Sequence, residues 1–193
     1  MTLLDIHVLG SPVLRRETRP VERTDDELQR LIDDMFETMY AAKGIGLAAP
    51  QVGRLERLTV IDVDEKPIVL INPELVHTEG TIKGEEGCLS IPEIYGDVER
   101  AGRVVVNALD RQMQPFSIEG TELLSRCLQH EIDHLHGKLF IDYLSLFKRR
   151  AAMSKWEEMR SEYPGLLRRV ALEAESEGRG GRGEGRGEQV EGF

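Results

Sequence analysis

Apolar residues near the N-terminus recur with the period of a helix. The repeating positions are Leu28, Leu31, Ile32, Met35, Phe36, Met39 and Tyr40. Thr24 is followed three residues later by Glu27, which is the pattern of a capping box, so we expect Thr24 to cap the helix. Gly44 lies where a C-terminal cap is expected. The pattern predicts one amphipathic helix over 25–42.

The middle of the chain carries short runs rich in Val and Ile, separated by Gly, Pro, Asn and Asp. These runs cover 58–63, 67–76, 103–110 and 114–119. No helical stretch separates them, so they predict antiparallel strands rather than repeated βαβ units. Two further helices are expected, over 121–136 and 145–162. The order of helix, strands and helices predicts an α+β fold.

The composition changes towards the C-terminus. From about residue 175 the chain consists mainly of Glu, Gly and Arg and has almost no apolar side chains. Such a segment cannot offset the entropy lost on ordering. We therefore expect one folded domain over 1–165 and a Gly/Arg/Glu-rich tail over 166–193 that is disordered.

Charge and hydropathy narrow the choice of partners. The net charge is −10, and an acidic surface repels phosphate backbones, so we expect no DNA partner. The longest aliphatic run, 68–71, is far shorter than a membrane span, so we expect no membrane partner. The N-terminus shows no targeting segment, and two cysteines, Cys88 and Cys127, are too few for a disulfide scaffold. These features favour a cytoplasmic protein.

The sequence His130-Glu131-Ile132-Asp133-His134 carries the strongest chemical signal. Two histidines four residues apart on a helix lie one turn apart on the same face, so both imidazoles can reach one metal ion. Glu131 falls in an apolar stripe with Leu124, Leu128 and Leu135. Burial raises the pKa of a carboxyl group towards neutrality, as a general base requires. The pattern predicts a metal-binding HExxH helix.

A catalytic metal site needs a third protein ligand. Cys127 is on the same helix but lies about 7–8 Å along the axis from the level between the histidines, which is too far. Glu157 and Glu158 are on the third predicted helix and stay open as ligands. Cys88 is equally open, because the adjacent Gly87 lets backbone and substrate approach closely.

Three segments, in their order, wording and spacing, resemble the signature motifs of peptide deformylases. They are Gly44-Ile45-Gly46-Leu47-Ala48-Ala49-Pro50-Gln51, Glu86-Gly87-Cys88-Leu89-Ser90 and the HExxH segment. The stretches 8–15 and 137–143 are also similar to that family, and the resemblance covers about residues 4–165.

The resemblance implies a metal-dependent hydrolase that removes the formyl group from the N-terminal formylmethionine of newly synthesised proteins and releases formate. It implies that the short antiparallel strands pack around a central metal-binding HExxH helix. It also implies one divalent metal ion, Fe²⁺, with Ni²⁺, Co²⁺ or Zn²⁺ as alternatives. The implied metal ligands are Cys88, His130 and His134, and the implied catalytic groups are Glu131 as general base, the Gln51 side chain and the Leu89 backbone N–H.

The resemblance also implies how substrate and partners bind. Nascent N-formylmethionyl polypeptides would lie along a backbone edge formed by Gly44, Ile45, Gly46 and Gly87. Spacing places a pocket at Ile45, Glu85, Tyr95, Arg126 and Cys127. The C-terminal region is expected to dock on the ribosome near the exit tunnel through basic residues of the third helix, which are Lys148, Arg149, Arg150, Lys155 and Arg160. The alternative is that these basic residues only form a solvated helix face.

Overall fold

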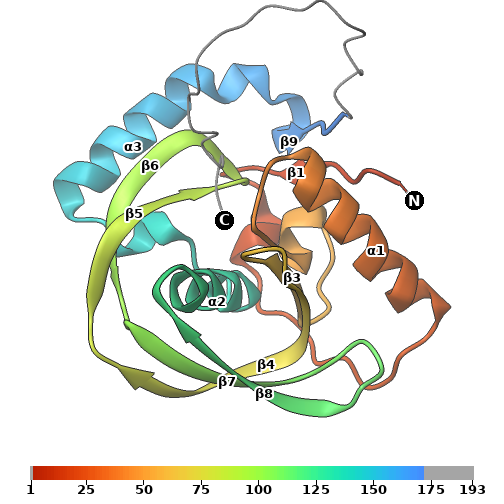
Figure 1. Cartoon of the computed structure of the whole chain (residues 1–193). Helices are drawn as coiled ribbons and strands as arrows, with labels where there is room; N and C mark the ends of the chain where they lie inside the picture. Colours follow the sequence, from red (N-terminus) through yellow and green to blue (C-terminus); the bar gives the residue numbers. More distant parts are fainter. Residues whose placement is uncertain (1, 172–193) are drawn as a thin grey trace, which may run out of the picture.

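Strands curve around one helix in the computed structural model, which describes residues 2–171 of the 193 in the chain (Figure 1). The enclosed helix is α2, Glu122–Leu135. Its apolar side packs on the strands through Cys127, Leu128 and Ile132, all of which are buried. Burial of this face stabilises the helix where its own propensity would not suffice.

The largest sheet has five strands in the order β2-β3-β4-β7-β8, and neighbouring strands are antiparallel throughout. The strands are β2 (Gly46–Ala48), β3 (Leu58–Asp62), β4 (Pro67–Glu79), β7 (Arg103–Leu109) and β8 (Pro115–Thr121). The predicted antiparallel α+β arrangement is confirmed, and all four predicted strands are present with shifted ends. Strand β2, which the pattern did not predict, is an edge strand of this sheet.

A second sheet is the hairpin of β5 (Ile82–Cys88) and β6 (Ile91–Arg100), which covers the other side of α2. The hydrophobic pattern missed both strands. Their sequences mix glycines and charged residues with few β-branched side chains, so the strand signal is weak. The register shifts between Glu86 and Cys88, which leaves Gly87 in a β-bulge.

Helix α1, Asp26–Ala41, confirms the first predicted helix but not its caps. The N-cap is Asp25 rather than Thr24, because the Asp25 carboxylate accepts the Leu28 N–H at 2.9 Å. After the helix, Lys43 takes the left-handed conformation with φ of 59°, so the position predicted for Gly44 is shifted by one residue.

Helix α3, Leu146–Met159, packs on β6 and is shorter than the predicted 145–162 because two 3₁₀ turns follow it. Trp156 on α3 is buried in the same apolar cluster as Ile91, Ile94 and Val98 of β6. This contact holds the β5–β6 hairpin between α2 and α3.

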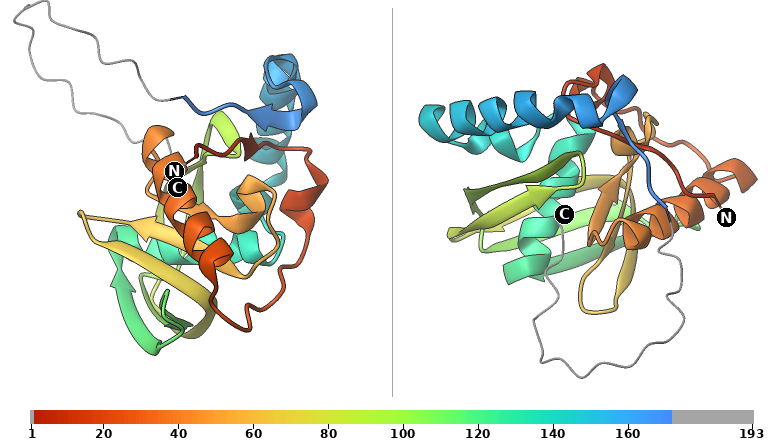
Figure 2. Two further views of the ribbon diagram at one scale, coloured as in Figure 1. Left: turned by 90° about the vertical axis from the view of Figure 1, so that its right-hand side faces the viewer. Right: turned by 90° about the horizontal axis from the view of Figure 1, so that it is seen from above.

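The two ends of the described chain meet in a small sheet (Figure 2). Strand β1 (Ile6–His7) pairs antiparallel with β9 (Leu167–Arg168). The division at residue 165 stays a prediction, and residues just past it pack on the body, since Leu166 and Val170 contact the apolar clusters. The rest of the predicted tail, 172–193, lies outside the described residues. Within residues 2–171, no helix is long and apolar enough to cross a membrane.

Candidate metal centre and active site

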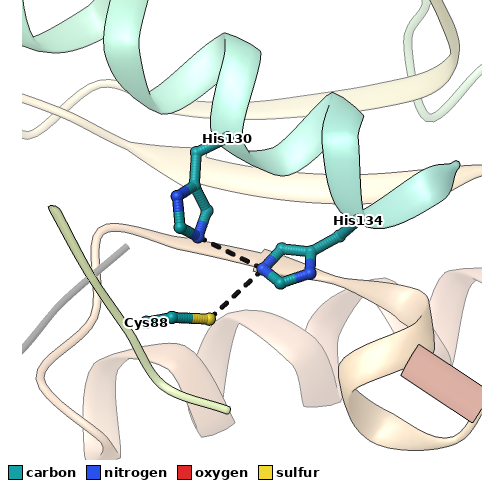
Figure 3. Close-up of side chains that lie close together, drawn as sticks. All are labelled: Cys88, His130 and His134. Atoms are coloured by element: carbon teal, nitrogen blue, oxygen red, sulfur yellow. Dashed lines mark hydrogen bonds between the residues drawn. The ribbon is translucent and has the colours of Figure 1, made fainter. Parts of the chain in front are cut away.

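Helix α2 and the end of β5 bring three candidate metal ligands together. His130 and His134 project from one face of α2 towards Cys88, the last residue of β5 (Figure 3). His134 Nε2 lies 3.2 Å from His130 Nε2 and 3.3 Å from Cys88 Sγ. All three side chains are buried, and their ligand atoms lie within 4.8 Å of one another.

These distances fit a divalent transition metal. An ion held by two imidazole nitrogens at about 2.0–2.1 Å and a thiolate at about 2.3 Å keeps the three atoms roughly 3.3–3.5 Å apart in a tetrahedral arrangement. One thiolate and two imidazoles are ligands suited to Fe, Co, Ni or Zn. Burial raises the pKa of the Cys88 thiol and lowers the pKa of His134, so the ion-free site favours uncharged side chains. A bound cation would favour the Cys88 thiolate.

The buried carboxylate of Glu86 orients His130, the first of the two histidines. Glu86 Oε2 lies 2.9 Å from His130 Nδ1, so the ring can donate there while Nε2 faces the metal position. Arg100 and Arg126 also donate to Glu86 at 2.8 Å. Burial alone would raise the pKa of Glu86, but the hydrogen bonds from His130 and Arg100 hold the pKa below its ordinary value. No sequence pattern indicated a role for Glu86, because its partners come from distant segments.

Glu131 follows His130 directly on α2 and is completely buried. Its Oε2 is 3.4 Å from the Thr59 hydroxyl, whereas its Oε1 has no hydrogen-bond partner among the described residues. Burial raises the pKa of Glu131 well above its ordinary value, and the charges of Glu86 and Asp133 add to this. An unpartnered carboxylate oxygen in this position can accept a proton from a water molecule.

Gly44 and Gly46 let two side chains of the site pack directly against the backbone. A Cβ at Gly46 would lie 2.4 Å from Glu131 Oε1, and a Cβ at Gly44 would lie 2.6 Å from the Leu89 side chain. Neither glycine has a left-handed φ, so close packing rather than backbone conformation requires them. Ile45 lies between them, and its carbonyl accepts the Asp62 N–H of β3.

Gln51 reaches the site from the 3₁₀ turn Ala49–Val52. Its Nε2 lies 3.6 Å from Cys88 Sγ and 3.2 Å from Ser90 Oγ. Leu89 and Ser90 form the two-residue turn that joins β5 to β6, since Cys88 pairs with Ile91. The structure thus places Gln51 and Leu89 next to the ligand from β5.

The residues expected to line one pocket separate into two groups. Glu85 and Tyr95 line a cavity of about 470 Å³ between β6 and α3. Arg126 is buried and donates to Glu86 and to the Val98 carbonyl. Cys127 Sγ faces the Ile45 carbonyl at 3.7 Å. Their grouping into one pocket stays a prediction.

The alternatives considered for the third metal ligand are not part of the Cys88–His130–His134 cluster. Glu157 lies on α3 with 59% of its side chain exposed and pairs with Arg160. Cys127 is not part of the ligand cluster, in agreement with its distance along the helix. Asp133 pairs with Arg100 at 2.6 Å and accepts the Tyr143 hydroxyl at 2.9 Å.

Comparison with known proteins decides the family. The family model described as polypeptide deformylase matches residues 3–150. The chain belongs to the peptide deformylase family. A peptide deformylase of Alkalilimnicola ehrlichii is 53% identical over 163 residues, which cover 82% of this chain and 92% of that protein. One of Hydrogenovibrio crunogenus is 50% identical over 84% of this chain and 98% of that protein.

Solved structures of peptide deformylases share the fold. The enzyme from Legionella pneumophila has a TM-score of 0.81 and 49% identity, covering 83% of this chain and 97% of that chain. The enzyme from Synechococcus elongatus, in complex with actinonin, has a TM-score of 0.76 and 47% identity over 79% of this chain and 85% of that chain. Peptide deformylases are metal-dependent enzymes that remove the N-terminal formyl group from nascent proteins, so the predicted activity is confirmed.

Proposed function

We propose that this chain deformylates nascent N-formylmethionyl polypeptides at the Cys88–His130–His134 centre. The observation that carries the proposal is the ligand cluster itself, with its atoms within 4.8 Å and the unpartnered oxygen of Glu131 beside it. When bound there, a divalent metal ion supplies a Lewis acid that activates water and polarises the formyl oxygen.

Glu131 moves the proton. As the formyl carbon is attacked, Glu131 accepts the proton of the attacking water on its free Oε1. It then delivers this proton to the leaving amine of the methionine, so the products are formate and a free N-terminus. Such acid–base transfer contributes about 10²–10⁴-fold to the rate. The raised pKa of Glu131 supports both steps, because a strongly acidic carboxyl would accept the proton poorly.

Gln51 and Leu89 stabilise the charge that develops on the formyl oxygen. The Gln51 amide lies next to the ligand Cys88, and the Leu89 backbone N–H follows that ligand directly in the chain. One donor of this kind is worth roughly 3–4 kcal/mol in the transition state.

The substrate backbone pairs with the open edge of β2. Strand β2 pairs with β3 on one side only. The Gly44 N–H and the Ile45 carbonyl are already bonded to Met39 and Asp62, so the other backbone groups of Gly44, Ile45 and Gly46 would form the hydrogen-bonded edge for a peptide. Gly87 lies in the bulge opposite, where the ladder between β5 and β6 is interrupted. An extended N-terminal peptide would thus enter between the two sheets and present its formyl group to the metal ligands.

Fe²⁺ is the proposed native ion, and Ni²⁺, Co²⁺ and Zn²⁺ are alternatives with the same ligand preference. The thiolate donates more charge to the ion than a carboxylate would and is itself open to oxidation, so the iron form should be sensitive to oxygen. The proposed location is the cytoplasm, where nascent chains appear and thiols stay reduced.

The test is formate release from formyl-Met-Ala-Ser by protein purified without oxygen, with metal analysis of the same sample. Cys88→Ser should lose both metal and activity. Cys127→Ser is the matched control, since both cysteines are buried and only Cys88 belongs to the cluster. Equal metal content in the two variants would contradict the ligand assignment.

We also propose that α3 docks on the ribosome near the exit tunnel. The support is an exposed basic helix on an acidic protein, with Leu146 76% and Phe147 84% exposed at its start. Lys148 and Arg149 each pair with one acidic residue, so Arg150 and the apolar pair are the freer contacts. Co-sedimentation with ribosomes should weaken as salt rises, and reversal of Arg149 and Arg150 to Glu should abolish it. Binding that ignores both changes would contradict the proposal.

A further inference from the structure

The Gln51 side chain is held on three sides in the interior of the protein. It is 0% exposed. Its Oε1 accepts the Ala48 backbone N–H at 2.8 Å, its Nε2 donates to Ser90 Oγ at 3.2 Å, and the same nitrogen lies 3.6 Å from Cys88 Sγ. Every polar group of this amide therefore has a defined neighbour.

The orientation of the amide follows from these neighbours. If oxygen and nitrogen were exchanged, the Nε2 hydrogens would face the Ala48 N–H, so two donors would oppose each other. The exchanged oxygen would also face the sulfur of Cys88, whose thiolate is an acceptor. Ala48 and Cys88 thus decide which end of the amide faces the metal ligands, but they do not fix the direction of each N–H bond.

Ser90 fixes the direction of the Gln51 N–H bonds. The two N–H bonds of a primary amide lie in one plane at about 120°, so fixing one direction fixes the other. When one hydrogen is donated to Ser90 Oγ, the second points towards Cys88 and the metal position. Ser90 is itself rigid, because its side chain is 0% exposed and its carbonyl accepts the Leu9 N–H at 2.8 Å.

We propose that Ser90 is a positioning residue for deformylation, which aims one Gln51 N–H at the developing oxyanion through its own hydroxyl. This rests on the proposed function. The turn between β5 and β6 would then stabilise the oxyanion in two ways. The Leu89 N–H would donate to it directly, and Ser90 would act indirectly by orienting Gln51. Without the hydroxyl, the amide keeps its bond to Ala48 but can tilt away from the reacting oxygen.

Ser90→Ala tests this role with little change in volume. Loss of a complete oxyanion donor costs about 10²–10³-fold in kcat, and a misplaced donor should cost less, so we expect kcat to fall about tenfold with KM within twofold of wild type. Metal content and Tm should stay close to wild type, because the Ser90 backbone next to Cys88 is unchanged.

A double-mutant cycle separates positioning from general packing. Gln51→Met keeps the side-chain length and removes the amide, so adding Ser90→Ala to Gln51→Met should lower kcat no further. Ser125→Ala is the matched control, since Ser125 is also 0% exposed and donates to the Ala101 carbonyl at 2.8 Å, away from Gln51. This control should leave kcat unchanged.

The outcomes are distinct. A tenfold loss that disappears in the Gln51→Met background supports the role of Ser90. An equal loss in both backgrounds, or no loss in either, overturns it. If Ser90→Ala does not fold, Ser90→Cys replaces it in the same cycle and is read by the same criteria. If the wild-type protein with metal bound releases no formate, the proposed function fails as well, which the single variants alone would not show.

Discussion

Gly46→Ala places one methyl group against the proposed general base. Gly46 pairs with Ile61 in β2 and has no left-handed φ, so the backbone accepts alanine. The new Cβ, however, would lie 2.4 Å from Glu131 Oε1, 2.8 Å from Cδ and 2.9 Å from Cγ. Contacts of this kind below 3.0 Å are essentially never seen, so the Glu131 carboxyl has to move.

The size of the effect follows from the required displacement. To reach even 3.0 Å, Oε1 must retreat by about 0.6 Å from the position in which it is free to take a proton. A misplacement of about 1 Å in a reacting group can cost about 10²-fold in rate. We therefore expect kcat to fall about 10- to 100-fold, while the metal content stays at the wild-type level because the ligands are not touched.

The assay is formate release from formyl-Met-Ala-Ser at saturating substrate, with metal content and Tm measured on the same preparations. Gly102→Ala is the matched control. It also lacks a left-handed φ, and its Cβ would meet Ile82 Cγ2 at 3.3 Å and otherwise the backbone of Glu79 and Thr81 at 3.7 and 3.9 Å, none of which belongs to the site. The reasoning is refuted if Gly46→Ala keeps more than a third of the wild-type kcat.

Other substitutions test further parts of the site and the fold. Glu131→Gln should keep its metal and lose about 10²–10⁴-fold in kcat, and a tenth of the wild-type rate would contradict its role. The iron form, bound through the Cys88 thiolate, should lose activity in air faster than the nickel form in parallel incubations with and without oxygen. Burial alone would raise the pKa of Asp142, but its hydrogen bond from Arg15 lowers it below 3.8. The ionised carboxylate therefore stabilises the fold above that pH, and the Tm deficit of Asp142→Asn should shrink as the pH falls below 3.8. A chain that ends at residue 173 should keep its Tm and activity, whereas one that ends at residue 165 loses β9 and should melt earlier.

Sequence patterns predicted the parts of this protein whose signals are local. The helix period gave α1 and α2 almost to their ends, and the two histidines of α2 followed from their spacing alone. The N-cap was misplaced by one residue because Thr24 and Asp25 are both good capping residues, and only the local backbone decides which of them reaches Leu28.

The parts that were missed depend on contacts between distant segments. The β5–β6 hairpin has weak strand propensity and is held by α3 on one side and α2 on the other. The sequence showed Glu86 only as the first residue of a motif. Its partners, which are 14 to 44 residues away in the chain, are Arg100, Arg126 and His130. Pairing of this kind has no periodic signal. Chemistry and local period therefore predicted the two histidines, the family resemblance added Cys88, and neither indicated the partners of Glu86.

The pairing of β1 with β9 has a consequence for the order in which the chain is made. Ile6, which is 0% exposed in the finished fold, has Arg168 as its strand partner. At synthesis rates of about 5–20 residues per second, the partner appears roughly 10 to 30 s after Ile6 itself. During that time the backbone of the first strand lacks its partner, although the Ile6 side chain belongs to the apolar cluster that includes Leu31 and Met35 of α1. Pairing of β1 with β9 is thus among the last steps of folding during synthesis, and a chain whose synthesis stalls before residue 167 would leave β1 without its partner strand.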